Sequence, residues 1–274
     1  MIPAAFDYQR PASVDEAIRL LTDSGDEAKI LAGGHSLLPL MKLRLAAPSL
    51  LIDIGRLRDL SYITDAGDHI AIGALTRHHE VETSSVLRAQ VPLLAHATSQ
   101  VGDPQVRHRG TIGGSLAHGD PASDLPAVCL ALGATFTAAG PGGSRQIPAD
   151  DFFQGFLETA LEPNEVLVEI SVPKVPDAGW SFQKFNRRAQ DWAIVGVAAV
   201  HNGSTGVALV NMASTPVRAS SVESAIAGGA SAGEAAAHAS DGLDPPADLN
   251  ASTEYRRHLA EVLVRRALQE AGVA

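Results

Sequence analysis

Two pairs of adjacent glycines, each close to hydroxyl side chains, are the residues of this sequence best suited to hold an anion. The first pair lies in the stretch AGGHS at residues 32–36, and the second lies in TIGGS at residues 111–115. Glycine allows backbone N–H groups to approach an anion closely, and a Ser or Thr hydroxyl adds another donor. One such pair is most often an ordinary turn. Two pairs, one in each half of a single domain, predict a dinucleotide whose diphosphate is bound from both sides.

The spacing of these glycines disfavours two familiar nucleotide-binding loops. A Rossmann domain carries G-x-G-x-x-G and a P-loop carries G-x-x-x-x-G-K-[ST], and neither pattern occurs at these positions. A dinucleotide bound by these glycines therefore requires a different fold.

The segment from His118 to Asp124 (HGDPASD) combines one histidine with two aspartates. Such a set could ligate a hard metal ion, but Pro121 directly after Asp120 is typical of the first turn of a helix. We therefore expect Asp120 to cap a helix. Asp124, one turn further on, would face either the sugar hydroxyls of a ligand or water. Cys129 falls on the apolar face of this helix and is expected in the core.

Lysine is rare in this chain, which otherwise uses arginine as its basic residue. Lys29 comes just before the first glycine pair, and Lys184 begins the unusual segment KFNRRAQDWA at residues 184–193. Two interpretations of this segment remain open. Lys184 and Trp192 could contact a ligand, or they could be a surface charge on a strand and an anchor in the core.

Hydrophobic periodicity predicts helices set between short strands over the first 175 residues. We expect strands at 28–32, 50–54, 69–73 and 134–138, with a tight reversal at 140–143. Helices are expected after Ser13, which can form a capping box with Glu16, and from Thr76, Pro92 and Asp120. The adjacent histidines 78 and 79, at the start of a helix, are expected on the solvated surface.

From about residue 176 the pattern changes to strands followed by helices. Three strands are expected at 181–186, 193–200 and 206–212, and Asn202-Gly203 predicts a hairpin turn between the last two. Helices follow around Val222 and Glu234, and a last one begins near Ser252. This order predicts a small antiparallel sheet with helices on one face.

The composition limits the class of protein. The 274 residues are 45% hydrophobic and carry a formal net charge of −10, which excludes extensive disorder and disfavours a nucleic-acid or anionic-membrane partner. The single cysteine, Cys129, excludes disulfides and any Cys-based zinc or iron–sulfur site built from this chain alone. Neither a leader nor an apolar run of about 20 residues is visible, so a soluble, cytoplasmic protein is expected.

Three motifs in this order resemble the FAD-binding medium subunit of the molybdenum hydroxylases, such as the carbon monoxide, xanthine and N-heterocycle dehydrogenase complexes. They are KILAGGHSL at 29–37, TIGGSLAHGDPASDLP at 111–126 and the segment 184–193, and the likeness covers essentially the whole chain. The resemblance implies an α+β fold. An FAD-binding domain of the vanillyl-alcohol-oxidase (PCMH) type would occupy 1–176, with subdomains of about 1–55 and 56–176. A C-terminal domain with a three-stranded antiparallel sheet and helices would occupy 177–274.

The resemblance also implies which residues bind FAD, without a covalent bond. The two glycine loops would hold the diphosphate, Asp124 would bind ribose or ribityl hydroxyls, and Lys184 would stabilise the reduced flavin beside its polar edge. Trp192 replaces the Phe or Tyr more common in relatives near the isoalloxazine. No catalytic residue and no metal ligand is expected. The implied FAD-binding residues are Lys29, Ile30, Leu31, Ala32, Gly33, Gly34, His35, Ser36, Leu37, Val101, Thr111, Ile112, Gly113, Gly114, Ser115, Ala117, Asp120, Asp124, Leu167, Lys184 and Trp192.

The resemblance assigns the chain a role in electron transfer. A large molybdopterin-binding subunit would oxidise the substrate, and two [2Fe–2S] clusters on a small subunit would pass the electrons to this FAD. The flavin would deliver them to NAD, a quinone or another acceptor, and the complex would be a dimer of heterotrimers. Two alternatives remain open. One is a self-contained flavin reductase or oxidase of the same fold, as in UDP-N-acetylenolpyruvoylglucosamine reductase, and the other is a non-redox subunit in which the nucleotide is a scaffold.

Overall fold

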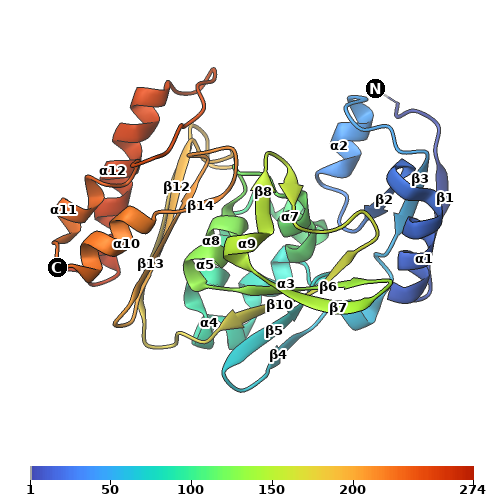
Figure 1. The fold of residues 1–274 in the computed structure, drawn as a ribbon, viewed down its shortest axis with the longest axis horizontal. Coiled ribbons are helices and arrows are strands. Elements are labelled where there is room, and N and C mark those ends of the chain that lie inside the picture. The colour runs from blue at the N-terminus through green and yellow to red at the C-terminus, as the bar shows by residue number, and fades with distance from the viewer. Residues whose placement is uncertain (1) are drawn as a thin grey trace.

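The computed structural model describes residues 2–274, which form three lobes in chain order (Figure 1). The N-terminal lobe (blue) lies at one end of the molecule, the central lobe (cyan to yellow) in the middle and the C-terminal lobe (orange to red) at the other end. No helix among the described residues has the length and apolar character needed to cross a membrane.

The N-terminal lobe is a parallel three-stranded sheet in the order β1-β3-β2, packed against one helix. The helix begins as expected, since the Ser13 hydroxyl accepts a hydrogen bond from the Glu16 N–H at 3.2 Å. Its residues Ala17, Ile18 and Leu21 are buried. The elements of this lobe are β1 (Asp7–Gln9), α1 (Val14–Ser24), η1 (Gly25–Glu27), β2 (Ala28–Leu31), α2 (Leu37–Lys42) and β3 (Leu50–Asp53).

The central lobe is an antiparallel five-stranded sheet in the order β4-β5-β10-β6-β7, with helices packed against it. The expected reversal at 140–143 is present and joins β6 to β7. The elements are η2 (Arg58–Leu60), β4 (Ile63–Asp65), β5 (His69–Gly73), α3 (His78–Thr83), α4 (Ser85–Gln90), α5 (Pro92–Ser99), α6 (Pro104–Arg109), α7 (Ile112–His118), α8 (Asp124–Leu132), β6 (Thr135–Gly140), β7 (Gly143–Pro148), α9 (Ala149–Phe152), β8 (Phe153–Gly155), β9 (Glu158–Thr159) and β10 (Val166–Pro173).

The C-terminal lobe is an antiparallel sheet in the order β11-β12-β13-β14. The three expected strands are present, and a two-residue fourth strand extends the sheet. The elements are β11 (Gly179–Phe185), β12 (Val195–His201), β13 (Thr205–Val210), β14 (Val217–Arg218), α10 (Ser220–Ala227), α11 (Ala232–Ala236) and α12 (Thr253–Glu270). The last helix begins after Ser252, whose hydroxyl accepts a hydrogen bond from the Tyr255 N–H.

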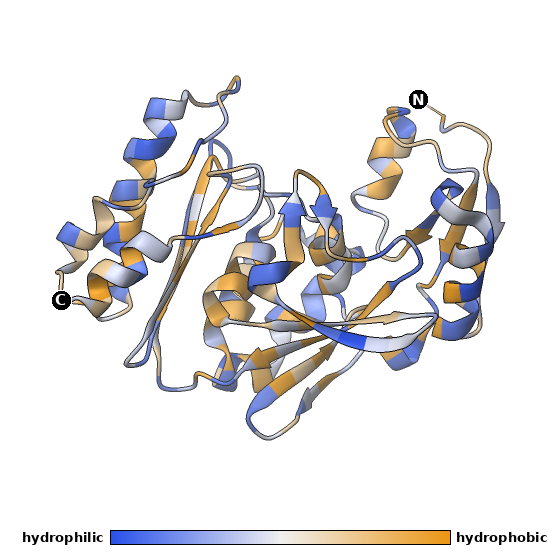
Figure 2. Ribbon diagram, in the orientation of Figure 1, coloured by the Kyte–Doolittle hydropathy of each residue, from blue (hydrophilic) through white to orange (hydrophobic). Residues whose placement is uncertain are grey.

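Helices cover both faces of this sheet, whereas the sequence predicted helices on one face only. Val197 and Leu209 pack in the cluster formed with α10, α11 and α12, and Ala198 and Val210 pack in the cluster that contains α5 and α8 of the central lobe. Figure 2 shows apolar residues along β12 and β13, as expected for strands buried on both sides. The central and C-terminal lobes therefore share a core.

The prediction that Asp120 caps a helix was wrong. Helix α8 begins at Asp124 after Ser123, and the Asp120 carboxylate accepts a hydrogen bond from the Ala122 N–H at 2.8 Å, which closes a turn. A helix that began at Pro121 would place Pro126 in its interior, where the missing N–H removes a hydrogen bond. In α8, Pro126 lies in the first turn instead. Every residue of α8 is buried, and Cys129 lies in the core as expected.

Candidate functional site

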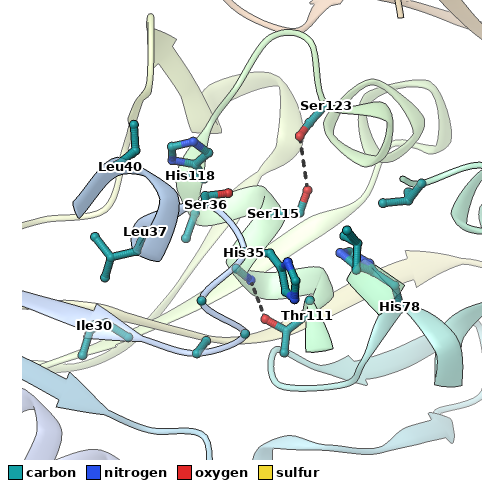
Figure 3. Close-up of a pocket in the computed structure, with 18 of the residues that line it drawn as sticks. Ile30, His35, Ser36, Leu37, Leu40, His78, Thr111, Ser115, His118 and Ser123 are labelled. Carbon is teal, nitrogen blue, oxygen red and sulfur yellow. Dashed lines mark hydrogen bonds between the residues drawn. The ribbon is translucent and has the colours of Figure 1, made fainter. Parts of the chain in front are cut away.

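A cavity of about 680 Å³ is lined by residues of all three lobes. Its walls come from the β2–α2 loop, from α7 and the chain around it, from the residues just after the β8–β9 hairpin, and from the segment 184–192. Figure 3 shows the side chains of His35, Ser36, Thr111, Ser115 and His118 among those that line this space. The cavity brings together residues as distant in the chain as Leu21 and Trp192.

The first glycine loop, residues 32–36, joins β2 to α2 and lies directly against the second loop. A Cβ atom at Gly33 would be 2.6 Å from the Arg109 carbonyl oxygen and 2.8 Å from the Gly110 Cα, so no other residue fits without moving backbone. Gly34 has a φ of +78°, a region that glycine adopts without strain. The sequence therefore forms this wall by close approach of two backbones.

The second glycine loop is fixed by its own threonine. The Thr111 hydroxyl accepts a hydrogen bond from the Gly114 N–H at 3.2 Å and caps α7. A Cβ at Gly114 would lie 2.7 Å from that hydroxyl oxygen, and its next neighbour would be the Ala32 Cβ at 3.9 Å. Gly114 therefore faces the cavity. Gly113 faces the other way, because its Cβ would collide with Ala74.

The first loop presents several backbone donors. Within residues 2–274, the N–H groups of residues 33–36 donate no hydrogen bond to a protein acceptor. Backbone N–H groups are obligatory donors, so a run of them at a cavity wall calls for a bound acceptor. These four donors, next to the second loop, are suited to the oxygens of a phosphate or diphosphate.

Lys184 and Asp124 form a buried ion pair at the cavity. The Lys184 Nζ lies 2.6 Å from Asp124 Oδ2 and also donates to the Gln100 carbonyl at 3.0 Å, and the two side chains are only 4% and 6% exposed. Burial raises the pKa of Asp124 to about 6, although the charge of Lys184 opposes this shift. The interpretation of Lys184 as a surface charge was wrong.

One oxygen of Asp124 remains available to a ligand. Among the described residues, its Oδ1 is buried and accepts no hydrogen bond. Asp124 lines the cavity, so a ligand hydroxyl could donate to this oxygen while Lys184 holds the other one. A sugar or ribityl hydroxyl is a donor of this kind.

Trp192 lies at the rim of the cavity and is 58% exposed. The interpretation of Trp192 as a core anchor was therefore wrong. Its segment, residues 186–194, joins β11 to β12, and Gln190 and Asp191 line the cavity beside it. An exposed indole at a cavity mouth can pack against the flat face of a bound ring.

The prediction of a solvated His78 was also wrong. His78 lines the cavity and is only 4% exposed. Gly110 packs against its ring so closely that a Cβ on Gly110 would lie 2.8 Å from it. Its Nδ1 has no partner in the described chain, and burial, with the nearby His35 and two arginines, lowers its pKa to about 4. The sequence placed this residue at a helix start but gave no sign that the loop before Thr111 passes over it.

Replacement of His78 by glutamine should make the protein less sensitive to acid. The pKa of His78 is about 4 in the folded chain and near 6.5 in an unfolded one, so the unfolded state binds the extra proton. The stability that this difference provides is present above pH 6.5 and is lost as the pH falls toward 4. We expect the melting temperature of His78→Gln to decline less than that of the parent between pH 6.5 and 4.5. An unchanged pH slope would contradict this account, and His79→Gln is the control, since His79 is partly exposed.

The structure brings most of the predicted site residues together. Those that line the cavity are Lys29, Ile30, Ala32, Gly33, Gly34, His35, Ser36, Leu37, Val101, Thr111, Gly114, Ser115, Ala117, Asp124, Lys184 and Trp192. Those that do not line it are Leu31, Ile112, Gly113, Asp120 and Leu167. Leu167 is buried in the core on β10. The cavity also has walls that the sequence did not indicate, among them Val106, Thr159, Leu161 and Gln190.

The described residues contain no group of three or more His, Cys, Asp or Glu side chains placed to hold a metal ion. A cavity between lobes, with two glycine loops and a run of open backbone donors, defines a protein that binds a cofactor containing a phosphate group. Residues 4–175 match the family described as the FAD binding domain in molybdopterin dehydrogenase, and residues 180–271 match the CO dehydrogenase flavoprotein C-terminal domain. The chain therefore belongs to the FAD-binding molybdopterin dehydrogenase family, which confirms the resemblance drawn from its motifs.

Several relatives match this chain over nearly its whole length. The chain is 45% identical to the carbon monoxide dehydrogenase medium chain of Hydrogenophaga pseudoflava, with 99% of this chain and 98% of the relative covered. It is 41% identical to the 6-hydroxypseudooxynicotine dehydrogenase complex subunit alpha of Paenarthrobacter nicotinovorans, with 99% and 96% covered. A solved structure of carbon monoxide dehydrogenase from H. pseudoflava has a chain that matches with a TM-score of 0.96, covering 99% of this chain and 98% of that one. The predicted α+β fold is confirmed.

Proposed function

We propose that this chain binds FAD in the cavity and acts as the electron-transfer subunit of a molybdenum-containing hydroxylase or dehydrogenase complex. The observation that carries the proposal is the run of open N–H groups at residues 33–36, which lies beside Thr111 and Gly114 in the wall of a cavity of about 680 Å³. The family match over residues 4–175 supports FAD as the ligand.

The residues present fit this cofactor. The two glycine loops would hold its diphosphate, Asp124 Oδ1 would accept a hydrogen bond from a sugar or ribityl hydroxyl, and Trp192 would cover the exposed side of the ring. Lys184 would place a positive charge near the ring while it stays bonded to Asp124. When bound, FAD supplies reversible two-electron chemistry, and the chain supplies its binding and electrostatic surroundings. The division into domains at residues 176 and 177 is part of the same proposal, supported by the limits of the two family matches.

The electrons would come from clusters on another polypeptide. Cys129 is the only cysteine, it is buried in α8, and burial raises the pKa of its thiol to about 12, so it is unsuited to ligate iron. We propose a large molybdopterin-binding subunit and a small [2Fe–2S] subunit as partners in a dimer of heterotrimers, with NAD, a quinone or another acceptor outside the complex, in the cytoplasm. The relatives are named as a medium chain and as a complex subunit, which favours this role over a self-contained flavin enzyme.

The relatives do not identify the substrate. Chains that are 45% and 41% identical to this one are named for carbon monoxide and for 6-hydroxypseudooxynicotine, two chemically unlike molecules. The FAD subunit of such a complex need not touch the hydroxylated molecule, so its sequence carries little information about it.

The isolated chain should bind FAD and oxidise no substrate by itself. We expect the purified protein to take up FAD stoichiometrically, with quenching of flavin fluorescence, and to reduce no dye when offered carbon monoxide or an N-heterocycle. Addition of the large and small subunits should restore turnover. Substrate oxidation by the isolated chain, free of molybdenum, would overturn the subunit role, and a chain that binds no FAD would overturn the whole proposal.

A further inference from the structure

Arg256 of α12 is fully buried in the C-terminal lobe, although its side chain carries a charge. Its Nη1 donates to the Ile194 carbonyl and, at 3.4 Å, to the Asn211 carbonyl, and its Nη2 donates to Asp248 at 2.8 Å. Burying a charge is costly unless it is paired and hydrogen-bonded. Both terminal nitrogens of Arg256 meet that requirement with bonds to two backbone carbonyls and one carboxylate, whereas its buried Nε has no partner among the described residues.

Asn211 extends this set of bonds to the cavity walls. Its backbone N–H donates to the Pro121 carbonyl at 2.8 Å, and its Nδ2 donates to the Ala193 carbonyl at 2.8 Å. Asn211 has a φ of +62°, a left-handed conformation that asparagine tolerates better than most residues. Asn211 thus contacts both the turn that leads to Asp124 and the residue that follows Trp192.

The segment that carries Trp192 has few other attachments. All hydrogen bonds recorded for residues 187–192 in the described chain lie within the segment or with Asn186, namely those of Asn186 and Arg188 with Asp191. The carbonyls of Ala193 and Ile194, bonded to Asn211 and Arg256, are the first points at which the chain beyond Trp192 is held by other parts of the C-terminal lobe. The Ile194 N–H also closes the strand pair by donating to Phe185.

We infer that Asn211 and Arg256 are positioning residues that fix Trp192 over the cavity. They hold the two carbonyls after Trp192, and Asn211 ties them to the turn before Asp124, so the rim and the wall of the cavity keep a fixed separation. The role given to these two residues rests on the proposed FAD site, whereas the contacts that hold Trp192 do not depend on it. Loosening this junction should let Trp192 move and should weaken FAD binding, while the strand pairing of the sheet remains.

The sharpest test is Asn211→Gly in a Trp180→Phe background, where Trp192 is the only tryptophan. Glycine keeps the left-handed backbone and both backbone hydrogen bonds, and only the side-chain bond to Ala193 is lost. We expect lower fluorescence anisotropy of Trp192 in the FAD-free chain. We also expect about a three- to tenfold rise in the Kd for FAD, the effect of one lost hydrogen bond. Asn202→Gly, in the exposed β12–β13 turn, is the matched control and should change neither the Trp192 anisotropy nor the Kd for FAD.

A second variant separates positioning from folding. Arg256→Lys keeps the charge but supplies one nitrogen where arginine supplies two, so it cannot bond both the carbonyls and Asp248 as Arg256 does, and it should change the anisotropy and the Kd in the same direction as Asn211→Gly. If either the Trp192 anisotropy or the Kd for FAD of Asn211→Gly equals that of the parent, the inference is overturned. If the parent binds no FAD, the proposed function fails, and the anisotropy of the FAD-free chains alone decides whether the junction positions Trp192.

Discussion

Gly114→Asp is expected to abolish FAD binding. Gly114 faces the cavity beside Ala32, so a new side chain would enter the space proposed for the diphosphate and would place a negative charge against it. Juxtaposed like charges cost several kcal/mol, which corresponds to at least about a hundredfold rise in Kd. The measurement is a titration of the FAD-free chain, followed by quenching of flavin fluorescence.

Two further variants control for this result. Gly142→Asp adds the same charge at an open position of the β6–β7 turn and should leave FAD binding unchanged. Gly114→Ala removes the charge but keeps the contact with the Thr111 hydroxyl, so its effect should be intermediate. Normal flavin content in Gly114→Asp, with a folded chain, would refute the assignment of this loop to the diphosphate.

Lys184→Met is expected to destabilise the FAD-free chain by about 3–5 kcal/mol at pH 7, the usual cost of removing one partner from a buried ion pair. The change leaves the Asp124 carboxylate buried without a counter-charge. A second change, Asp124→Asn, removes that charge and should restore much of the stability. Lys174→Met is the matched control, because Lys174 pairs with a half-exposed Asp65 and such pairs contribute at most about 1 kcal/mol.

The pH dependence of the stability of Lys184→Met shows whether the buried Asp124 charge causes the loss. The pKa of Asp124 is about 6 in the folded chain and near 3.9 in an unfolded one, so protonation favours the folded state. Its contribution is fully present below pH 4 and is lost as the pH rises through 6. Without Lys184 the folded pKa rises further, so the deficit of Lys184→Met should be larger at pH 7 than at pH 5. Equal deficits in urea unfolding at both pH values would show that the buried charge is not responsible.

Much of the fold could be predicted because its signals are local. Ser13 caps its helix, and the turns at 140–143 and at Asn202-Gly203 form where the sequence places them. The strand at 193–200 was predicted from its apolar run. The helices that cover its second face were not predicted, because that face packs against α8 of another lobe. The start of α8 was missed although Pro126 carried the information.

The site was predictable where backbone geometry alone defines it. Gly33 and Gly114 line the cavity, and the two pairs of adjacent glycines next to hydroxyl residues had indicated this. The burial of His78 and the pairing of Lys184 with Asp124 were not predictable from local pattern, since each depends on a segment distant in the chain. Gly113 shows the limit of the motif, because of two adjacent glycines only one faces the cavity.

The Lys184–Asp124 pair has a consequence for the order of events during synthesis. The partners are 60 residues apart, and Lys184 is made only after all the strands and helices of the first two lobes have been synthesised. Until β11 and β12 pair, the cavity lacks the wall formed by the segment 184–192, and Asp124 has no counter-ion. A complete site therefore requires the C-terminal lobe, and we expect a polypeptide that ends before β11 to lack both this wall of the cavity and the partner of Asp124.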